Sequence, residues 1–414
     1  MKNSNTVYRG WWVLAGLFLI YAASNGILMH TLPLTYPALI DEFGWTAAQV
    51  TTPASILFVI AAITSPPTGF LLDRFSARRV ILFGAIAMVA GLFAFSYISE
   101  LWHMIAVYVV FALALSACGI VSTMLVLTRW FNHLRGRATG ILLLASSLGA
   151  SLFPLILGAG MNSFGWRGSL TIFAALAAVL AILPALFLLK DQPAPGETDG
   201  PINSTLKLIG PTFREAICQP RYYLIAFATG SIWLTVISLL QHQPIFLAKD
   251  LGVDTATVLP RVFSIFFAFS VAGKFAFGWL SDRLDKGFTL ISSLFILATS
   301  LVLLRSLDGG NTLIIYAYAA IAGIGFSGSF TTIQIWIASF YAGQSYGKIL
   351  ASLTLFDTLS GALGTWLAGI MRDNLGSYIP VISLMIGLCM LAAISIAIVR
   401  YLHNSSTPSE TSTL

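Results

Sequence analysis

Twelve long apolar segments dominate the 414-residue chain. Each is about 20 residues long, which is enough for a helix to cross the roughly 30 Å hydrocarbon core of a bilayer. The apolar residues run continuously rather than alternating, which favours helices over the strands of a membrane barrel. The chain is 57% hydrophobic and only 9% charged, too few charges to cover the surface of a soluble protein this size. The sequence therefore predicts an all-α polytopic membrane protein.

The expected spans form two groups of six, separated by one long polar insertion rich in proline and glycine. That insertion covers residues 190–221, so we expect six-helix halves over residues 1–189 and 222–402. Residues 403–414 are rich in Ser and Thr and are expected to form a disordered tail. The spans are expected at residues 11–37, 48–72, 80–98, 103–128, 138–161, 168–189, 222–247, 257–281, 288–306, 311–338, 348–371 and 379–401.

The positive charge of this chain is a topology signal. Most of the 22 Lys and Arg residues fall in loops on one side of the membrane, which the positive-inside rule places in the cytoplasm. The net charge of +6 therefore gives no indication of a nucleic-acid partner. The first span follows a short polar start without a signal-peptide pattern, so we expect it to be retained. We expect a monomer in the plasma (inner) membrane with both termini cytoplasmic.

A short loop motif lies between the second and third spans and returns 209 positions later, between the eighth and ninth. Each copy places an acid and a base four and five residues after a glycine. The motif residues are Gly69, Asp73, Arg74 and Arg78 in the first copy and Gly278, Asp282 and Arg283 in the second. A carboxylate near a helix end and several bases is stabilised by charge-assisted hydrogen bonds. The alternative is that these bases only set the topology.

The repeated motif resembles the loop that the major facilitator superfamily carries at the same two places. The resemblance covers the chain apart from its termini and central loop. It implies two six-helix halves with a substrate site near the midplane between them, and transport by alternating access. It also implies that the motif loops act as gates, with Asp73 latching the outward-open state. Gly69 is then expected to let a partner helix approach closely.

Lys274 and Asp357 are the two charges that lie deepest in apolar spans. A charge in mid-bilayer costs about 2.5–3.5 kcal/mol, so such residues usually avoid lipid and are functional. Counted from the cytoplasmic helix ends, both lie about 12–14 Å deep. We expect the two side chains to face each other, with Lys274 contacting an anionic solute and Asp357 binding a proton. The alternative is an ion pair that only locks two helices together.

Four other polar residues are candidates for substrate binding. His30 and Asn25 lie on the first span, and a histidine titrates in the range that suits a proton relay or an anion contact. His242 lies toward the outer end of the seventh span, between two glutamines. Ser327 belongs to a run of small polar residues on the tenth span, which either pack helices closely or line a pore. A lone histidine is also often only a satisfied polar residue.

Several local patterns resemble the monocarboxylate-porter and oxalate:formate-antiporter branch of that superfamily. They are Gly10-Trp11-Trp12, Glu42-Phe43-Gly44-Trp45, Trp130-Phe131 with Arg135-Gly136, Gly165-Trp166-Arg167, and Gly273-Lys274. The resemblance implies that Lys274 contacts the substrate carboxylate. Two departures matter: Ser270 stands where mammalian-type carriers place an aspartate, and Asp357 is the only mid-span charge where oxalate exchangers have a second base. This nearly neutral set favours a monoanion moved with a proton over a dianion.

The sequence as a whole predicts a secondary active transporter that works by alternating access and carries a small organic monocarboxylate together with a proton. It contains no G-x-x-x-x-G-K-[ST] run, so ATP is not expected to drive it. No metal-ligand cluster or nucleophile–base spacing appears, so we expect no cofactor, no metal and no enzymatic activity. The alternatives are export of drug-like, sugar or siderophore-type solutes, and a transporter-like sensor that binds without moving solute. Drug export has weak support, because Phe153 stands where drug exporters carry a second glycine.

Overall fold

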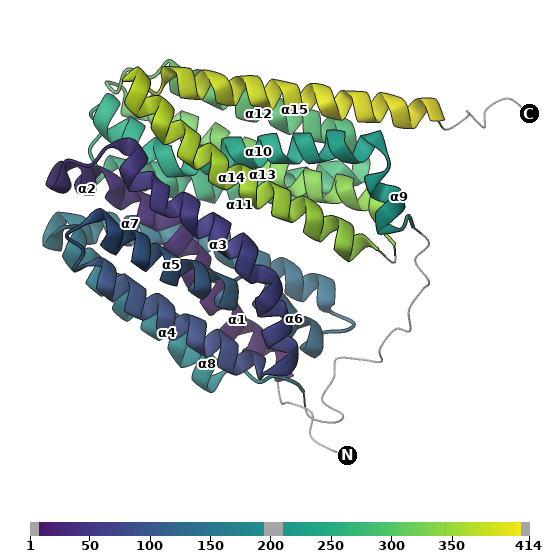
Figure 1. Ribbon diagram of the computed structural model, residues 1–414, viewed down its shortest axis with the longest axis horizontal. Helices are drawn as coiled ribbons and strands as arrows, with labels where there is room; N and C mark the ends of the chain where they lie inside the picture. Colours follow the sequence, from purple (N-terminus) through teal and green to yellow (C-terminus); the bar gives the residue numbers. More distant parts are fainter. Residues whose placement is uncertain (1–7, 194–209, 344, 407–414) are drawn as a thin grey trace, which may run out of the picture. The chain divides into compact units, whose positions relative to one another are not determined.

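The computed structural model describes residues 8–193, 210–343 and 345–406, and every regular element in these ranges is a helix (Figure 1). A helix satisfies each backbone N–H and C=O within its own segment, which hydrocarbon requires of a chain that crosses it. The chain divides into two compact units. The first unit is Met1–Ser204 with Leu240–Ala268, and the second is Thr205–Leu239 with Phe269–Leu414.

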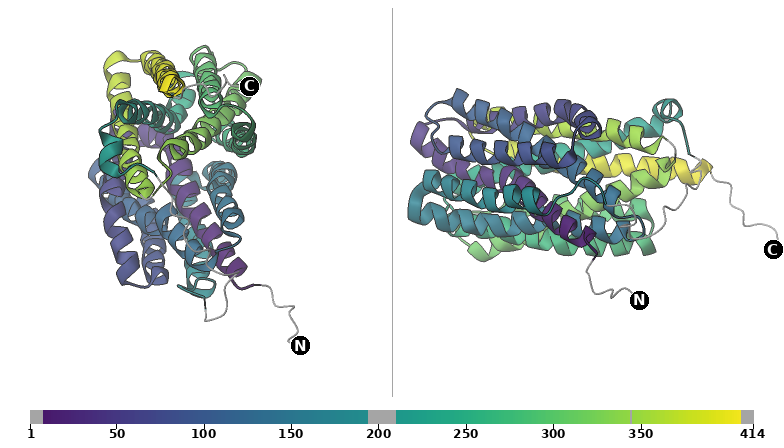
Figure 2. Two further views of the ribbon diagram at one scale, coloured as in Figure 1. Left: turned by 90° about the vertical axis from the view of Figure 1, so that its right-hand side faces the viewer. Right: turned by 90° about the horizontal axis from the view of Figure 1, so that it is seen from below.

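The first unit contains the first six expected spans. Within it α1 lies against α7, α4 packs on both α5 and α7, and α3 packs on α5 (Figures 1 and 2). The elements are α1 (Gly10–Asn25), η1 (Gly26–Thr31), η2 (Leu32–Thr35), α2 (Tyr36–Phe43), α3 (Ala47–Arg74), α4 (Ala77–Phe95), α5 (Leu101–Cys118), α6 (Ile120–Trp130), α7 (Arg135–Ala177), η3 (Ala178–Ile182) and α8 (Leu183–Phe187).

A single glycine divides α7 into two membrane passes. The stretch Arg135–Phe187 has 53 residues, far more than one crossing needs. At Gly165 the backbone has φ 67° and ψ 179°, a conformation that is essentially restricted to glycine. The chain turns there, so the fifth and sixth expected spans are separate helices.

The first span is a series of short helical segments rather than one uniform helix. After α1 the chain forms the π-helical turn η1 and the 3-10 turn η2 before α2 begins. Pro33 and Pro37 lack a backbone N–H, which favours breaks in the regular α-helical hydrogen bonding. Gly44, with φ 66°, ends α2 in the left-handed conformation that commonly closes a helix.

The second unit holds the remaining spans, and two of its helices extend into the first unit. Within the second unit α12 packs against both α13 and α15. Its complete helices are α9 (Phe213–Ile217), α12 (Lys286–Arg305), α13 (Thr312–Tyr341), α14 (Tyr346–Leu375) and α15 (Ile379–Ser406). The shared helices are α10 (Pro220–Ile245) and α11 (Val258–Arg283), joined through the π-helical turn η4 (Phe246–Asp250).

Polar contacts attach residues 240–268 to the rest of the first unit. The Lys249 ammonium forms an ion pair with Asp41 of α2. On α7, the Ser151 hydroxyl donates a hydrogen bond of 3.1 Å to the carbonyl oxygen of Ser264. These contacts explain why this segment belongs to the first unit, although it follows the central loop in the sequence.

The number of helices agrees with the expected twelve spans. In the described part of the chain, ten helical stretches are long and apolar enough to cross a membrane. One of them contains the two passes that meet at Gly165, and α14, with 30 residues, supplies the remaining span.

Two polar segments differ in part from the sequence expectation. The tail was expected from residue 403, but α15 continues to Ser406, and residues 407–414 lie outside the described ranges. The central loop contains the short helix α9, because Thr212 and Glu215 form a reciprocal capping box at its start. Residues 194–209 of that loop also lie outside the described ranges.

Candidate functional site

Lys274 is partly buried and lies on α11 opposite two exposed alanines. Ala272 and Ala276 are exposed, and each is about 200° around the helix from Lys274. The Lys274 Nζ lies 6.0 Å from the ring centroid of Phe330 on α13. Because an ammonium group among lipid tails is costly, this orientation is the one expected of a lysine that serves a solute pathway.

Asp357 is a buried carboxyl group on α14, with 3% of its surface exposed. It interacts with the hydroxyl of Thr229 on α10, and that hydroxyl also donates a hydrogen bond of 3.1 Å to the Ala226 carbonyl oxygen. Among the described residues, no donor reaches Asp357 Oδ1. Since burying an uncompensated charge is costly, this carboxyl group is suited to binding a proton.

The expected pairing of Lys274 with Asp357 stays a prediction. Both residues belong to the second unit, on α11 and α14. Lys274 Nζ lies near the Phe330 ring, and Asp357 interacts with the Thr229 hydroxyl. The second unit therefore contains both ionisable groups, on two different helices.

Asn25 and His30 lie at the irregular turn of the first span. Asn25 immediately precedes η1, and η1 contains His30. The His30 ring centroid lies 4.4 Å from that of Phe267, and Asn25 Nδ2 donates a hydrogen bond of 3.5 Å to Ser24 Oγ. Both side chains are half-buried. Single π-helical turns frequently occur at functional sites, so the local geometry supports both candidates, whose contact with solute stays a prediction.

The glycine-rich part of the fifth span packs against the first. A Cβ on Gly26 would lie 2.9 Å from the Gly149 carbonyl carbon and 2.7 Å from the Phe153 ring. A Cβ on Gly149 would lie 2.7 Å from the Ala22 carbonyl oxygen. Only hydrogen atoms fit at these two positions, so α1 and α7 touch through their backbones. Packing, rather than a drug-export pattern, accounts for these glycines.

His242 lies in a buried polar cluster on α10, with 2% of its surface exposed. Its neighbour Gln241 accepts a hydrogen bond of 2.9 Å from the Tyr36 hydroxyl, and the Tyr36 and Tyr108 hydroxyls lie 3.2 Å apart. The two tyrosines were not predicted. Their position within apolar spans could have indicated a polar cluster, because a buried tyrosine hydroxyl requires a hydrogen-bond partner. A solute contact by His242 stays a prediction.

Ser327 and its neighbours on α13 serve helix packing. Ser327 is fully buried, and its hydroxyl donates a hydrogen bond of 2.9 Å to the Gly323 carbonyl oxygen. It fills the space beside Gly273 of α11, where any added Cβ would clash with it. A Cβ on Gly325 would lie 2.6 Å from the backbone nitrogen of Leu297. The geometry supports the packing interpretation of this run, and a solute contact by Ser327 stays a prediction.

The first motif loop is tied to the end of the sixth span, in what we call the first joint. Asp191 accepts hydrogen bonds from Ser76 Oγ at 2.6 Å and from the Arg78 backbone N–H at 2.8 Å. The Arg78 guanidinium donates to the carbonyl oxygens of Ala185, at 3.0 Å, and Leu186 at the end of α8. A carboxylate at the start of α4 and a guanidinium at the end of α8 both complement the helix dipoles. The sequence interpretation did not include Asp191.

The other residues of the first motif copy are Gly69, Asp73 and Arg74. A Cβ on Gly69 would meet no described atom within 4 Å, so the structure does not support the close helix approach expected there. Arg74 is exposed, and the Asp73 side chain is outside what the structure describes. Arg129 reaches the end of α3 through a hydrogen bond of 3.4 Å to the Leu72 carbonyl oxygen. The latch role stays a prediction.

The second motif loop has a matching joint in which the acid and its partner have changed places. Asp285 and Arg400 stand 209 positions after Ser76 and Asp191. Asp285 Oδ1 accepts a hydrogen bond of 2.7 Å from the Phe288 backbone N–H at the start of α12. The same oxygen lies 2.8 Å from Arg400 Nε. In this second joint the acid lies on the motif loop, whereas in the first joint the acid Asp191 follows α8.

The acid and base of the second motif copy lie on the surface of their unit. Asp282 is exposed, and the Arg283 guanidinium carbon lies 4.1 Å from the Trp279 ring centroid. A Cβ on Gly278 would meet no described atom within 4 Å. An exposed cation–π contact is worth about 0.5–1 kcal/mol, so Trp279 holds Arg283 only weakly. A gating role for these residues stays a prediction.

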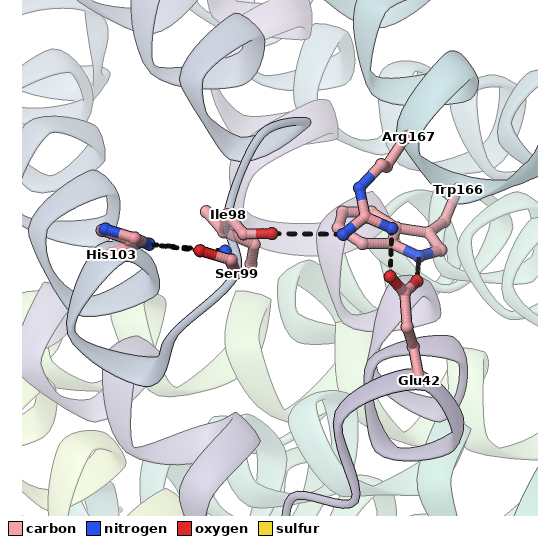
Figure 3. Close-up of polar contacts among 6 residues, drawn as sticks. All are labelled: Glu42, Ile98, Ser99, His103, Trp166 and Arg167. Atoms are coloured by element: carbon pink, nitrogen blue, oxygen red, sulfur yellow. Dashed lines mark hydrogen bonds and ion pairs between the residues drawn. The ribbon is translucent and has the colours of Figure 1, made fainter.

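Two motifs noted in the sequence meet in a polar clamp within the first unit (Figure 3). Glu42 of α2 accepts hydrogen bonds from Trp166 Nε1, at 2.6 Å, and from Arg167. The guanidinium also donates to the Ile98 carbonyl oxygen at 3.2 Å and lies 4.3 Å from the Trp166 ring centroid. The turn at Gly165 directs both side chains toward Glu42. The clamp joins three chain segments and gives both motifs a structural role in the first unit.

Comparison with known proteins decides the family. The sequence profile of the Major Facilitator Superfamily matches residues 13–262 and 243–413. The chain belongs to the major facilitator superfamily. The prediction that rested on the repeated loop motif is confirmed, and so is the twelve-helix facilitator fold.

Similar proteins include members of the branch that the sequence resembles. Monocarboxylate transporter 13 of Bos taurus is 27% identical, over 89% of this chain and 84% of its own length. The oxalate:formate antiporter of Oxalobacter formigenes is 24% identical, over 89% of this chain and 87% of its own. The crystal structure of a bacterial homologue of the human lysosomal transporter Spinster has a TM-score of 0.79 and 16% identity. It covers 99% of this chain and all of the other, and shares its fold.

Membership of the superfamily sets the general character of the protein. It is an integral, multi-pass membrane transporter, and its substrate is a small molecule. The long apolar helices contact lipid along their exposed sides, which accounts for the many exposed large hydrophobic residues.

Proposed function

We propose that this facilitator carries a small organic monocarboxylate together with a proton. The observation that supports the proposal is the pair of ionisable residues within long apolar helices of the second unit, Lys274 partly buried on α11 and Asp357 buried on α14. Such residues are expensive to place in a membrane and usually serve solute or proton movement. The names of the similar carboxylate transporters point to the same chemistry.

Lys274 is the proposed contact for the substrate carboxylate. An ammonium group is a compact point charge on a flexible stem, able to follow a carboxylate without a fixed bidentate geometry. Binding there exchanges the water around the anion for an opposite charge, which makes its passage through a region of low polarity less costly.

Asp357 is the proposed proton-binding group, and charge balance couples its proton to the anion. With Lys274 charged and Asp357 ionised, the empty pair has no net charge. With a bound proton and a bound monoanion, the set is again neutral. Either ligand alone leaves one uncompensated charge, which costs several kcal/mol in a region of low polarity. The carrier therefore reorients most readily when both ligands are bound or both are absent.

The same charge balance favours a monoanion over a dianion. Asp357 is the only charged residue in the middle of α14, so this helix supplies no second cation. A dianion beside Lys274 and a protonated Asp357 would leave a net negative charge. The name of the similar oxalate:formate antiporter pairs a dianion with a monoanion, so this preference is argued from the charged residues of the present chain.

The proposed orientation places both termini in the cytoplasm, with one chain acting alone in the plasma (inner) membrane. The distribution of Lys and Arg among the loops supports the orientation. The proton gradient then supplies the energy, since a proton moving down 100 mV provides about 2.3 kcal/mol.

Uptake of radiolabelled lactate into liposomes that contain the purified protein tests the proposal. An inward proton gradient is expected to drive accumulation above that of protein-free liposomes, which report uncharged acid crossing the lipid. Lys274→Ala is expected to reduce this uptake about tenfold or more, because a hydrogen bond to a charged group is worth about 1.5–3 kcal/mol.

The matched control is Phe275→Leu, the next residue on α11, whose side chain is 63% exposed. It is expected to transport lactate at the wild-type rate. Unchanged uptake by folded Lys274→Ala would remove the lysine from the site. Lactate accumulation that is the same with and without the proton gradient would exclude proton coupling.

A further inference from the structure

Three aromatic side chains of the second unit form a connected set with Phe330 next to Lys274, and we call Trp233, Phe326 and Phe330 the aromatic wall. The Phe330 ring centroid lies 6.0 Å from Lys274 Nζ, 5.8 Å from the Trp233 ring centroid and 6.2 Å from that of Phe326. The rings come from α10 and α13, and the lysine comes from α11. Three helices therefore combine one cation with a continuous set of rings.

The rings of the aromatic wall are partly exposed, whereas the α13 residues between two of them are buried. Its three rings and Lys274 are each partly exposed. Ser327 and Ser329, which both lie between Phe326 and Phe330 along α13, are fully buried. Rings that only fill a core, such as Phe263 and Phe266, are likewise fully buried. The wall therefore presents ring surface on the side of α13 where the ammonium lies.

The geometry of the wall suits an additional ring. Trp233 and Phe330 meet nearly edge to face, with an interplanar angle of 71°, and Phe326 is tilted by 38° from Phe330. Aromatic rings attract one another in edge-to-face or offset arrangements at centroid separations of about 4.5–7 Å. A guest ring beside Phe330 would carry an attached carboxylate to the neighbouring ammonium of Lys274.

We infer that the substrate is a monocarboxylate whose body is a flat aromatic ring. Lys274 binds the carboxylate, and Trp233, Phe326 and Phe330 pack against the ring. This inference rests on the proposed function and narrows it, because a carboxylate as small as formate or acetate would leave the rings without a partner. An aliphatic ring of similar size would bury similar area and lose the ring–ring attraction.

Calorimetric binding of three probe acids to the purified full-length protein tests the inference without depending on transport. The probes are benzoate, cyclohexanecarboxylate and acetate. Benzoate is expected to bind about two- to tenfold more tightly than cyclohexanecarboxylate, which is the ratio that the ring–ring attraction provides. Acetate is expected to bind more weakly than both, because it buries the least apolar surface.

Variants then assign the preference to the wall. Phe330→Leu is expected to abolish the preference for benzoate over cyclohexanecarboxylate while both acids still bind. Lys274→Gln is expected to weaken binding of all three acids. Phe275→Leu, on the exposed side of α11, is expected to leave every affinity unchanged. Phe326→Leu provides a second test of the wall if Phe330→Leu does not fold.

The possible results separate the inference from the function on which it rests. Acetate binding as tightly as benzoate, still dependent on Lys274, overturns the aromatic substrate and leaves a monocarboxylate carrier. Equal affinities for benzoate and cyclohexanecarboxylate in the wild type also overturn it. Failure of all three acids to bind overturns the proposed function and the inference with it.

Discussion

The surroundings of the Asp357 carboxyl group favour a role in proton binding that the residue type alone would not indicate. The carboxyl group is buried, interacts with one hydroxyl, and has an oxygen that no donor reaches among the described residues. A carboxylate that served only to lock helices would be expected to have all its oxygens satisfied. The setting of Asp357 instead leaves room for a proton to arrive and leave.

Replacement of this carboxyl group by an amide should separate the two modes of transport. Asp357→Asn keeps the size of the side chain and removes its ability to exchange a proton. We expect exchange of lactate across liposomes to continue, while accumulation driven by a proton gradient falls to the level of protein-free liposomes. Asp308→Asn, at an exposed position in a loop, should leave both unchanged. Equal loss of exchange and accumulation in Asp357→Asn would count against a proton role.

Sequence reasoning found the charged candidates at this scale but not their surroundings. Lys274 and Asp357 stand out because a charge within an apolar run is rare and costly. Asp191 and Tyr36 did not stand out, since their partners lie 72 or more positions away in the chain. No local pattern carries that information, and the same holds for the three rings near Lys274.

At the scale of helices, turns and caps decide how the apolar spans are arranged. The Glu42 clamp depends on the turn at Gly165, and the two joints depend on caps at the starts of α4 and α12. Span positions could be predicted because about 20 apolar residues are needed to cross a bilayer. The succession of α-helical, π-helical and 3-10 segments in the first span could not be predicted, because π-helical and 3-10 turns leave no periodic signal in an apolar run.

A substitution at Gly165 should destabilise the first unit. Gly165→Ala places a Cβ on a backbone with φ 67° and ψ 179°, which costs about 1–3 kcal/mol. We expect a lower melting temperature in detergent and a smaller yield of folded protein. Gly140→Ala is the control, since it lies exposed in the same helix and its Cβ would meet no described atom within 4 Å. A melting temperature for Gly165→Ala at or above that of Gly140→Ala would contradict the prediction.

The second joint offers a way to separate helix capping from ion pairing. Asp285→Asn retains a capping oxygen and loses the charge, and surface ion pairs are worth only about 0–1 kcal/mol. Asp285→Ala loses both, and loss of an N-cap costs about 0.5–2 kcal/mol. Thermal unfolding should therefore show a smaller loss of stability for the amide than for alanine. Identical losses would indicate that the contact with Arg400 dominates.

At the scale of the whole chain, the sequence repeat and the compact units give different divisions. The repeat at 209 positions divides the chain at the central loop, whereas contacts assign residues 240–268 to the first unit. The twelve-helix fold was predictable from span lengths and the duplicated loop. The attachment of this segment was not, because it depends on contacts such as that of Lys249 with Asp41.

The natural cysteines provide a test of the proposed orientation. Cys218 is exposed beside the central loop, whereas Cys118 and Cys389 are buried. If that loop is cytoplasmic, a membrane-impermeant maleimide should label inside-out vesicles and leave right-side-out vesicles unlabelled. Cys218→Ser should abolish the labelling. Labelling of right-side-out vesicles through Cys218 would reverse the proposed topology.

The exchanged partners in the two joints limit how such a duplicated gene can recombine. Whole halves could be swapped, because each brings a loop together with the helix end that matches it. A crossover within a half would instead set Asp285 against Asp191, two acids, or Ser76 against Arg400. A chimaera of that kind would lack one of the two joints, whereas an exchange of whole halves would keep both.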